Sequence, residues 1–155
     1  MKMYRYEYNV DAELFLTEAK DILYKHWQEL AVNKDKVYLK PDVQKYISLQ
    51  QSNILKNIVV YKDTTVVGYS VILIAPYLHY ADSILAQVDV VYVDPDYRHS
   101  TIGARLLVAS EKLAKDNGAG VIVHHAKPYV PMIIKPLEKL NYQLYEMIYG
   151  KYIGE

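Results

Sequence analysis

The part of the sequence that most constrains the fold runs from residue 84 to residue 125. Residues 84–93 are almost continuously apolar, which is typical of a buried strand, and Asp94-Pro95-Asp96 then predicts a turn. Residues 101–117 predict a helix with apolar residues on its buried side, namely Ile102, Leu106, Leu107 and Leu113. The apolar run 121–125 predicts another strand, which lies parallel to the first if the helix crosses over between them. This stretch therefore predicts a β–α–β unit.

The rest of the chain adds helices and strands to this unit. Asp11 is placed to cap a helix that ends near Asn33, and Pro41-Asp42 opens a second, shorter helix. The other predicted elements are strands at 54–61 and 66–75, a helix within 131–140 that kinks at Pro136 or begins near it, and a last strand at 143–153. The order predicts one domain, residues 1–155, of the α+β class: an α/β sandwich with a mixed central sheet and helices on both faces.

Composition excludes several classes of function. Lys and Arg total 18, as do Asp and Glu, so the formal net charge is zero and argues against tight binding to nucleic acid. Cysteine is absent, which excludes disulfides, a thiolate nucleophile and a Cys-ligated metal. The sequence shows neither a signal peptide nor an apolar run that could span a membrane, so we expect a soluble cytoplasmic protein without a membrane partner.

The loop before the helix 101–117 suggests an anion site. Residues 98–104 deliver several backbone N–H groups to the start of that helix, and such a place attracts a phosphate. An ordinary helix start, capped by Ser100 or Thr101, is the alternative interpretation.

Two motifs in this frame carry a resemblance to a known family. Arg98-His99-Ser100-Thr101-Ile102-Gly103 follows the pattern Arg/Gln-x-x-Gly-x-Gly/Ala, with Thr101 in place of the first glycine. Leu137-Glu-Lys-Leu-Asn-Tyr142 resembles Tyr-Glu-Lys-x-Gly-Phe, with Leu, Asn and Tyr at its first and last two places. With the element order, these motifs resemble the GNAT family of acetyl-CoA-dependent N-acyltransferases over nearly the whole chain. A phage-encoded branch of that family is similar in four shorter stretches, His26-Trp27-Gln28-Glu29, Gly68-Tyr69, Leu78-His79-Tyr80 and His125-Ala126-Lys127.

The resemblance implies the GNAT fold, a strand 87–93 that bulges and separates from the next parallel strand, and acetyl-CoA as co-substrate without a metal. Loop amides would hold the pyrophosphate, the freed strand would pair with the pantetheine arm, and the Val91 N–H would polarise the thioester carbonyl. The implied cofactor-binding residues are Val91, Tyr92, Val93, Arg98, His99, Ser100, Thr101, Ile102, Gly103 and Ala104.

Two residues are candidate general bases. Asp89 is an anion in an apolar strand, and by alternation it shares a face with Gln87 and Val91. If it is buried, it holds its proton more tightly, which suits a base that deprotonates an ammonium group; a structural carboxylate is the equal alternative. His79, in the loop before this strand, is the second candidate, although a lone loop histidine is more often neither base nor ligand. His26 and Glu29, three residues apart on the first helix, contact substrate or pair with each other.

Two departures from the family pattern leave other functions open. Thr101 narrows the approach of a phosphate, and Leu137 stands where many relatives have a tyrosine that protonates the leaving thiolate. We therefore predict an N-acetyltransferase for a small-molecule or protein amine, with two alternatives: a non-catalytic GNAT-fold binding or virion protein, and acyl modification of nucleic-acid bases in a phage. A homodimer is possible in each case, and a phage-encoded protein would work in the host cytoplasm.

Overall fold

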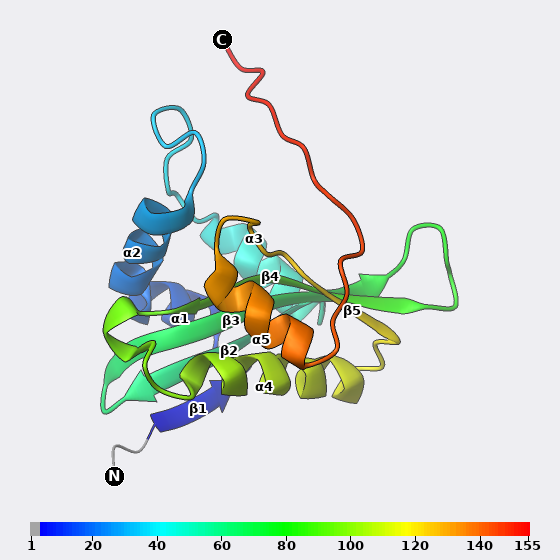
Figure 1. The fold of residues 1–155 in the computed structure, drawn as a ribbon, viewed down its shortest axis with the longest axis horizontal. Helices are drawn as coiled ribbons and strands as arrows, with labels where there is room; N and C mark the ends of the chain where they lie inside the picture. Colours follow the sequence, from blue (N-terminus) through cyan, green and yellow to red (C-terminus); the bar gives the residue numbers. More distant parts are fainter. Residues whose placement is uncertain (1–3) are drawn as a thin grey trace.

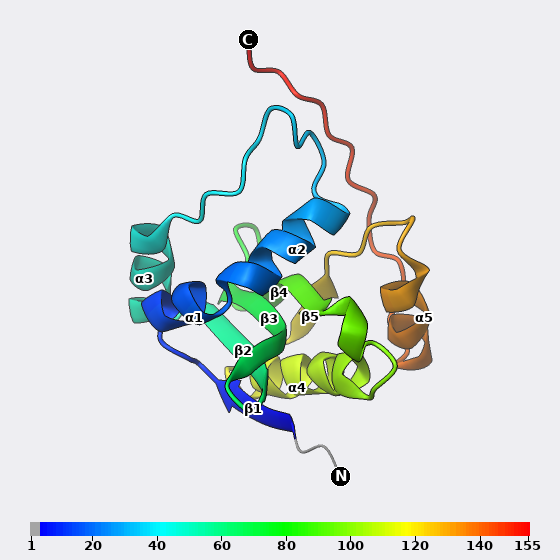
Figure 2. The same cartoon turned by 90° about the vertical axis from the view of Figure 1, so that its left-hand side faces the viewer.

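The computed structural model describes residues 4–155, and a five-stranded sheet lies at its centre between two groups of helices (Figures 1 and 2). The strands stand side by side in chain order: β1 (Tyr4–Tyr8), β2 (Leu55–Lys62), β3 (Thr65–Pro76), β4 (Ile84–Val93) and β5 (Val121–His124). Strands β1 to β4 pair antiparallel with their neighbours, whereas β5 runs parallel to β4. The predicted α+β class, with a mixed sheet covered on both faces, is confirmed.

Three helices cover one face of the sheet and two cover the other (Figure 2). The first group is α1 (Ala12–Glu18), α2 (Lys20–Leu30) and α3 (Val43–Gln51); the second is α4 (Ile102–Asp116) and α5 (Pro131–Lys139). The predicted helix cap is present, because the Asp11 carboxylate accepts from the amides of Glu13 and Leu14. The single helix predicted after it is divided at Ala19, which ends α1 and precedes α2.

Each face of the sheet has its own apolar core. On the α4 side, Ile102 and Leu106 pack with Ile72 and Val88 from the strands. On the other side, Phe15 of α1 packs with Tyr69 of β3. These two layers hold α2 and α4 on opposite sides of β4, the strand that organises the candidate site.

Strand β4 contains a bulge at Asp89. Val71 of β3 lies opposite Val90 and the next residue, Ile72, lies opposite Val88, so Asp89 has no partner of its own in β3. The bulge shifts the alternation of side chains by one residue. Before it, Ala86 and Val88 belong to the core under α4; beyond it, Val93 belongs to that core and Val91 packs against it. The prediction that Asp89 shares a face with Val91 is therefore wrong, because the extra residue shifts the alternation.

Pro136 lies inside α5. The helix begins at Pro131 and continues through Pro136 to Lys139, so the prediction that it begins near Pro136 is wrong. Pro131 in the first turn has no N–H that the helix would need, and it sets the starting backbone angle.

The two ends of the chain differ most from the sequence-based prediction. Strand β1 was not predicted, although Tyr4-Arg5-Tyr6-Glu7-Tyr8 alternates aromatic and charged residues as an edge strand does. The last strand, predicted at 143–153, is wrong, since those residues form no helix or strand. After α5, Asn141 adopts φ 66°, and the chain then leaves the body of the protein without meeting a strand edge (Figures 1 and 2).

Candidate active site

The parallel strands β4 and β5 separate at the middle of β4, and we call the opening between them the fork. They pair only along residues 85–88 of β4, and the His125 N–H closes the ladder by donating to the Val88 carbonyl over 3.1 Å. Within residues 4–155, no strand pairs with Asp89–Val93 on this side. Asp94 donates its N–H to Val67 of β3 over 3.0 Å, so by alternation the amide of Val93, and that of Val91 before it, point to the open edge.

A loop with unpaired amides follows this open edge. Asp94 caps the short 3-10 helix η1 (Pro95–Tyr97), because its carboxylate accepts from the Asp96 N–H over 3.0 Å. The chain then turns into α4, whose first residues have no preceding helical turn to accept their N–H groups. Among the described residues, no backbone or side-chain group accepts from four amides here, those of His99, Thr101, Gly103 and Ala104. The Thr101 side chain is exposed and caps no amide.

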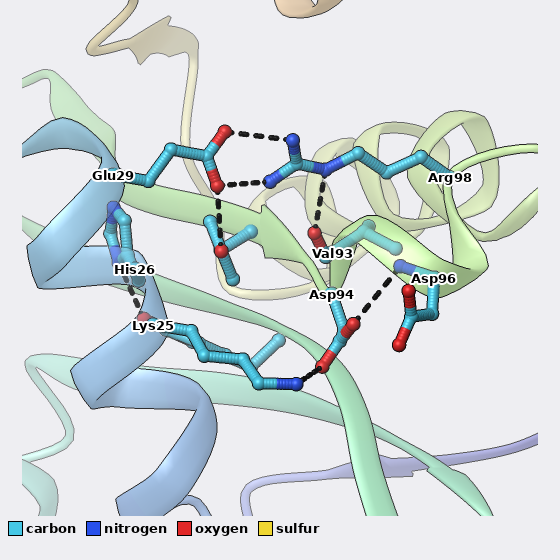
Figure 3. A network of polar contacts seen from close by, with 9 residues as sticks. Lys25, His26, Glu29, Val93, Asp94, Asp96 and Arg98 are labelled. Carbon is cyan, nitrogen blue, oxygen red and sulfur yellow. Dashed lines mark hydrogen bonds and ion pairs between the residues drawn. The ribbon is translucent and has the colours of Figure 1, made fainter.

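Arg98 connects the end of β4 to α2 (Figure 3). Its guanidinium donates twice to the Glu29 carboxylate, over 2.7 and 2.6 Å, and its Nε donates to the Val93 carbonyl over 2.9 Å. Tyr92 adds a third hydrogen bond to Glu29, of 2.8 Å. The hydrogen bonds from Arg98 hold the pKa of Glu29 below its usual value. The Arg98 charge is thus matched by Glu29, and what remains for an anion in the loop is backbone amides.

The last two turns of α2 contact both sides of the fork. On the β4 side, Lys25 donates to Asp94 over 2.6 Å, and this hydrogen bond raises the pKa of Lys25 (Figure 3). On the β5 side, the Lys127 ammonium donates to the Leu30 carbonyl, the kind of contact that suits a cation at a helix C-terminus. Residues that follow β4 and β5 are therefore fixed to the same helix.

On the α2 face of the fork, Asp89 lies at the open edge. Its side chain is 51% exposed, and its carboxylate lies 3.5 Å from Nδ1 of His125. Asp89 is therefore not buried, because the bulge turns the residue outward where β5 has already ended.

His26 lies beneath this face. Its Nδ1 is 2.6 Å from the Tyr69 hydroxyl, and its ring stacks on Tyr92 with centroids 4.5 Å apart. Burial, assisted by the nearby Lys127 charge, lowers the pKa of His26 to about 4. His26 is therefore neutral at physiological pH, and in place of the predicted pairing with Glu29 each of the two binds a different partner.

The structure brings together most of the predicted site residues but leaves one apart. Asp89, Val91 and the 98–104 loop all line the fork or its exit. His79 lies in the exposed loop before β4. The strand begins at Ile84, which is five residues from Asp89, or roughly 17 Å at the usual rise per residue. Sequence reasoning missed Lys25, although its spacing of four from Glu29 on one helix signals a shared face.

Three further observations concern the site and the chain around it. Leu137 is buried, 8% exposed, and has no proton to donate. The described residues contain no group of three or more His, Asp or Glu side chains arranged to hold a metal ion. No helix in the described part of the chain is long and apolar enough to cross a membrane.

Comparison with known proteins identifies the family. The model of the Acetyltransferase (GNAT) family matches residues 18–132, which include the fork, the loop and all of α4. The chain belongs to the GNAT acetyltransferase family. No curated protein matches this GNAT sequence.

Solved structures share the GNAT fold at low sequence identity. An aminoglycoside acetyltransferase from an uncultured soil metagenomic sample, crystallised with trehalose, has a TM-score of 0.75 and 17% identity, covering 98% of this chain and 96% of that one. Ribosomal-protein-alanine N-acetyltransferase from Brucella melitensis biovar Abortus 2308 has a TM-score of 0.72 and 18% identity, covering 98% and 100%. A predicted acetyltransferase with acetyl-CoA from Clostridium acetobutylicum has a TM-score of 0.69 and 16% identity, covering 97% and 96%.

Proposed function

We propose that this GNAT protein transfers an acetyl group from acetyl-CoA directly to an amine, without a covalent enzyme intermediate. The observation that carries the proposal is the set of unpaired amides at the start of α4, placed directly after the open edge of β4. A phosphate-bearing ligand suits the amides, because they combine free donors with the positive end of a helix dipole. An extended amide-containing chain suits the open strand edge, because both can exchange backbone-type hydrogen bonds.

Residues 98–104 would hold the pyrophosphate through their backbone, and Val91, Tyr92 and Val93 would line the pantetheine arm. The Val91 N–H would donate to the thioester carbonyl oxygen. Acetyl-CoA supplies the activated acetyl group. Arg98 holds the loop to Glu29 and to the Val93 carbonyl, so its role is to position the backbone amides of residues 98–104.

Asp89 is the proposed general base. Its half-exposed carboxylate at the open edge is accessible to an incoming ammonium group, and His125 beside it can share the proton. The catalytic role predicted for His79 draws no support from its exposed loop. Since Leu137 is buried and apolar, we propose that the leaving thiolate takes its proton from water.

The acceptor class and the setting also belong to the proposal. The aminoglycoside and ribosomal-protein acetyltransferases among the structural neighbours favour a small-molecule or protein amine. We propose one acyltransferase domain, residues 1–155, that works in the cytoplasm. The resemblance to a phage-encoded branch would place it in the host cytoplasm.

Thermal-shift titration tests cofactor binding. Acetyl-CoA at about a hundred times its Kd stabilises the folded state by about 2.7 kcal/mol, which raises the Tm of a chain of this length by roughly 5–10 °C. No shift at millimolar acetyl-CoA would contradict the proposal.

Glycine substitutions provide a matched pair of variants. A Cβ at Gly103 meets nothing closer than 3.9 Å, so an aspartate side chain fits there. Gly103→Asp places a negative charge among the amides that would hold the pyrophosphate. We expect it to abolish the acetyl-CoA shift, whereas Gly120→Asp, where a Cβ meets nothing within 4 Å, keeps the shift. Thr101→Gly removes the branched side chain and is expected to bind acetyl-CoA several-fold more tightly.

Release of free coenzyme A with a panel of amines tests catalysis. The buried Leu137 favours one alternative, a GNAT-fold protein that binds without turnover. Acetyl-CoA binding with no release across aminoglycosides, polyamines and peptide amines would support that alternative. Steeply salt-dependent DNA binding would instead support modification of nucleic-acid bases.

A further inference from the structure

A lysine of the chain itself lies at the fork, across from the residue to which we assign the thioester carbonyl. The ladder between β4 and β5 ends with the pair Val88 and His124. Val91 is the third residue after Val88, and Lys127 is the third residue after His124. Because the two strands run in the same direction, Lys127 and Val91 lie at similar levels on the two sides of the opening.

The Lys127 side chain lies on the α2 face of the fork. Its ammonium donates to the carbonyl of Leu30, the last residue of α2. Burial lowers the pKa of His26, the Lys127 charge lowers it further, and the Asp89 carboxylate opposes both. The ammonium and the carboxylate are thus both close enough to act on the same buried imidazole.

The proposed base is on this face as well. The Asp89 side chain is 51% exposed at the open edge, and its carboxylate lies 3.5 Å from Nδ1 of His125. His125 precedes Lys127 by two residues, so a short stretch of the chain after β5 carries both. An amine, a carboxylate that can accept its proton, and the Val91 N–H therefore meet at one opening.

Lys127 differs in its partner from Lys25, the other lysine that α2 brings to the fork. Lys25 forms an ion pair of 2.6 Å with Asp94, and this hydrogen bond raises the pKa of Lys25, so its amine holds its proton. Among residues 4–155, the Lys127 ammonium donates to a neutral carbonyl and has no carboxylate partner. Breaking one hydrogen bond therefore releases Lys127 into the opening.

We propose that this protein acetylates its own Lys127. The inference rests on the proposed function, because it uses acetyl-CoA bound at the fork, and it adds an acceptor that the chain carries itself. The Lys127 nitrogen forms a bond with the acetyl carbonyl carbon, and the bond from that carbon to the sulfur of coenzyme A breaks. The nitrogen loses two protons: Asp89 takes one and passes it to solvent, and water carries the other to the thiolate. Each modified chain consumes one acetyl-CoA and releases one free coenzyme A.

Acetylation changes how Lys127 contributes to the fold. An acetylated lysine has no positive charge, so the interaction of an ammonium with the C-terminal end of α2 is lost. The amide nitrogen that replaces the amine is no longer a nucleophile. The reaction therefore stops at one acetyl group on this residue.

Incubation of the full-length chain with acetyl-CoA, without any added amine, tests the proposal. Intact-mass measurement and peptide mapping follow the protein, and a thiol assay follows free coenzyme A. We expect the mass of one acetyl group per chain, located on Lys127, and one equivalent of coenzyme A. Because the amine and the site belong to one chain, the first-order rate should not change with protein concentration.

Three variants and an unfolded sample locate the reaction. Lys127→Arg keeps a cation for the Leu30 carbonyl but has no nucleophile, because a guanidinium stays protonated, so the acetyl group at this position should be lost. Lys25→Arg is the matched control and should keep acetylation of Lys127. Asp89→Asn removes the base and should slow the reaction by about 100-fold or more. The chain unfolded in urea gives the uncatalysed rate, with no preference for one lysine.

The outcomes separate this proposal from the proposed function. Lys127 left unmodified would overturn the self-acetylation. The thermal shift with acetyl-CoA and the release of coenzyme A with added amines are measured on the same sample: if both are present, the proposed function stands alone, and if the shift is absent, both proposals fail. A rate that rises with protein concentration, or that equals the rate of the unfolded chain, would also overturn the self-acetylation. Modified Lys127 without turnover of any added amine would support it.

Discussion

Two histidine side chains are held in their uncharged form by burial. The pKa of His26 is lowered to about 4, and so is that of His124, in each case chiefly by desolvation. His26 has the Tyr69 hydroxyl as a partner, whereas no described residue forms a hydrogen bond with either ring nitrogen of His124. Protonating either residue in the folded state is therefore costly.

These histidines predict acid sensitivity in a defined window. Between pH 6.5 and about 4 the unfolded chain binds protons at both residues and the folded chain does not. The two histidines therefore do not reduce the free energy of unfolding above pH 6.5. Below that pH, the free energy of unfolding falls as the pH drops, by up to about 1.4 kcal/mol per pH unit for each histidine. Urea titrations across this range measure the slope.

Single variants separate the two contributions. His26→Gln and His124→Leu should each remove the contribution of one histidine to the slope of unfolding free energy against pH, and the double variant should remove both contributions. His124→Leu should also leave stability at neutral pH equal or higher, because it deletes an unpartnered polar ring. A slope unchanged in both single variants would contradict the assignment.

Individual site residues were predictable only where their contribution comes from backbone N–H groups and not from side chains. The 98–104 loop and the β4 edge follow from element order and one motif, since any side chain leaves the amide in place. The hydrogen bonds of Glu29 with Arg98 and Tyr92 join residues 69 and 63 positions apart, respectively, which no local pattern indicates. Asp89 was correctly placed on the strand, but its exposure depends on where β5 ends.

At the scale of elements, α2 is fastened to the end of β4 by Glu29. Replacing Glu29 by Gln removes the charged partner of Arg98, and we expect a loss of about 1–2 kcal/mol in the free energy of unfolding at neutral pH. The pKa of Glu29 is lowered in the folded state. This contribution is therefore fully present when the pH is above the ordinary pKa of a glutamate, and it disappears as the pH falls through the folded-state pKa. Denaturant titration at pH 7 and in acid measures both.

Two variants control this measurement. Tyr92→Phe removes one neutral donor and should cost about 1 kcal/mol. Glu138→Gln, at an exposed position of α5, should cost almost nothing. Equal effects of the two glutamate changes would show that α2 is held by its apolar face alone.

Pro136 makes α5 weaker than its length suggests. Proline inside a helix removes one hydrogen bond and crowds the preceding turn, so Pro136→Ala should stabilise the protein by about 1–3 kcal/mol. Pro131→Ala, in the first turn where proline is favoured, should give no gain. Thermal unfolding and amide exchange in α5 distinguish the two; equal gains would contradict the explanation.

Elements were predictable where their signal is local. The cap at Asp11, the helix α4 and the strands β2 to β4 follow from residue spacing and capping within a few residues. The division at Ala19 and the bulge at Asp89 depend on packing across the sheet, which the sequence does not display. The segment 143–153 has the composition of a strand, but composition does not supply the neighbour with which a strand must pair.

At the scale of the whole molecule, the fold was more predictable than the function. Helices on both faces of a mixed sheet follow from the order of elements, because each apolar face must be covered by another element. The acceptor amine depends on the shape and charge of a few side chains around the fork, which the same fold arranges differently in different proteins.

The bulge at Asp89 has a consequence for how this strand can change in length. It allows β4 to present Ala86 and Val88 to one core, and then Tyr92 to the opposite one while Val93 returns to the first. Removing one residue at the bulge would leave three steps between Val88 and Tyr92, and regular alternation would then keep the two side chains on opposite faces without a bulge. Deletion of Asp89 is therefore expected to leave both cores intact, whereas deletion of two residues here would send the tyrosine under α4.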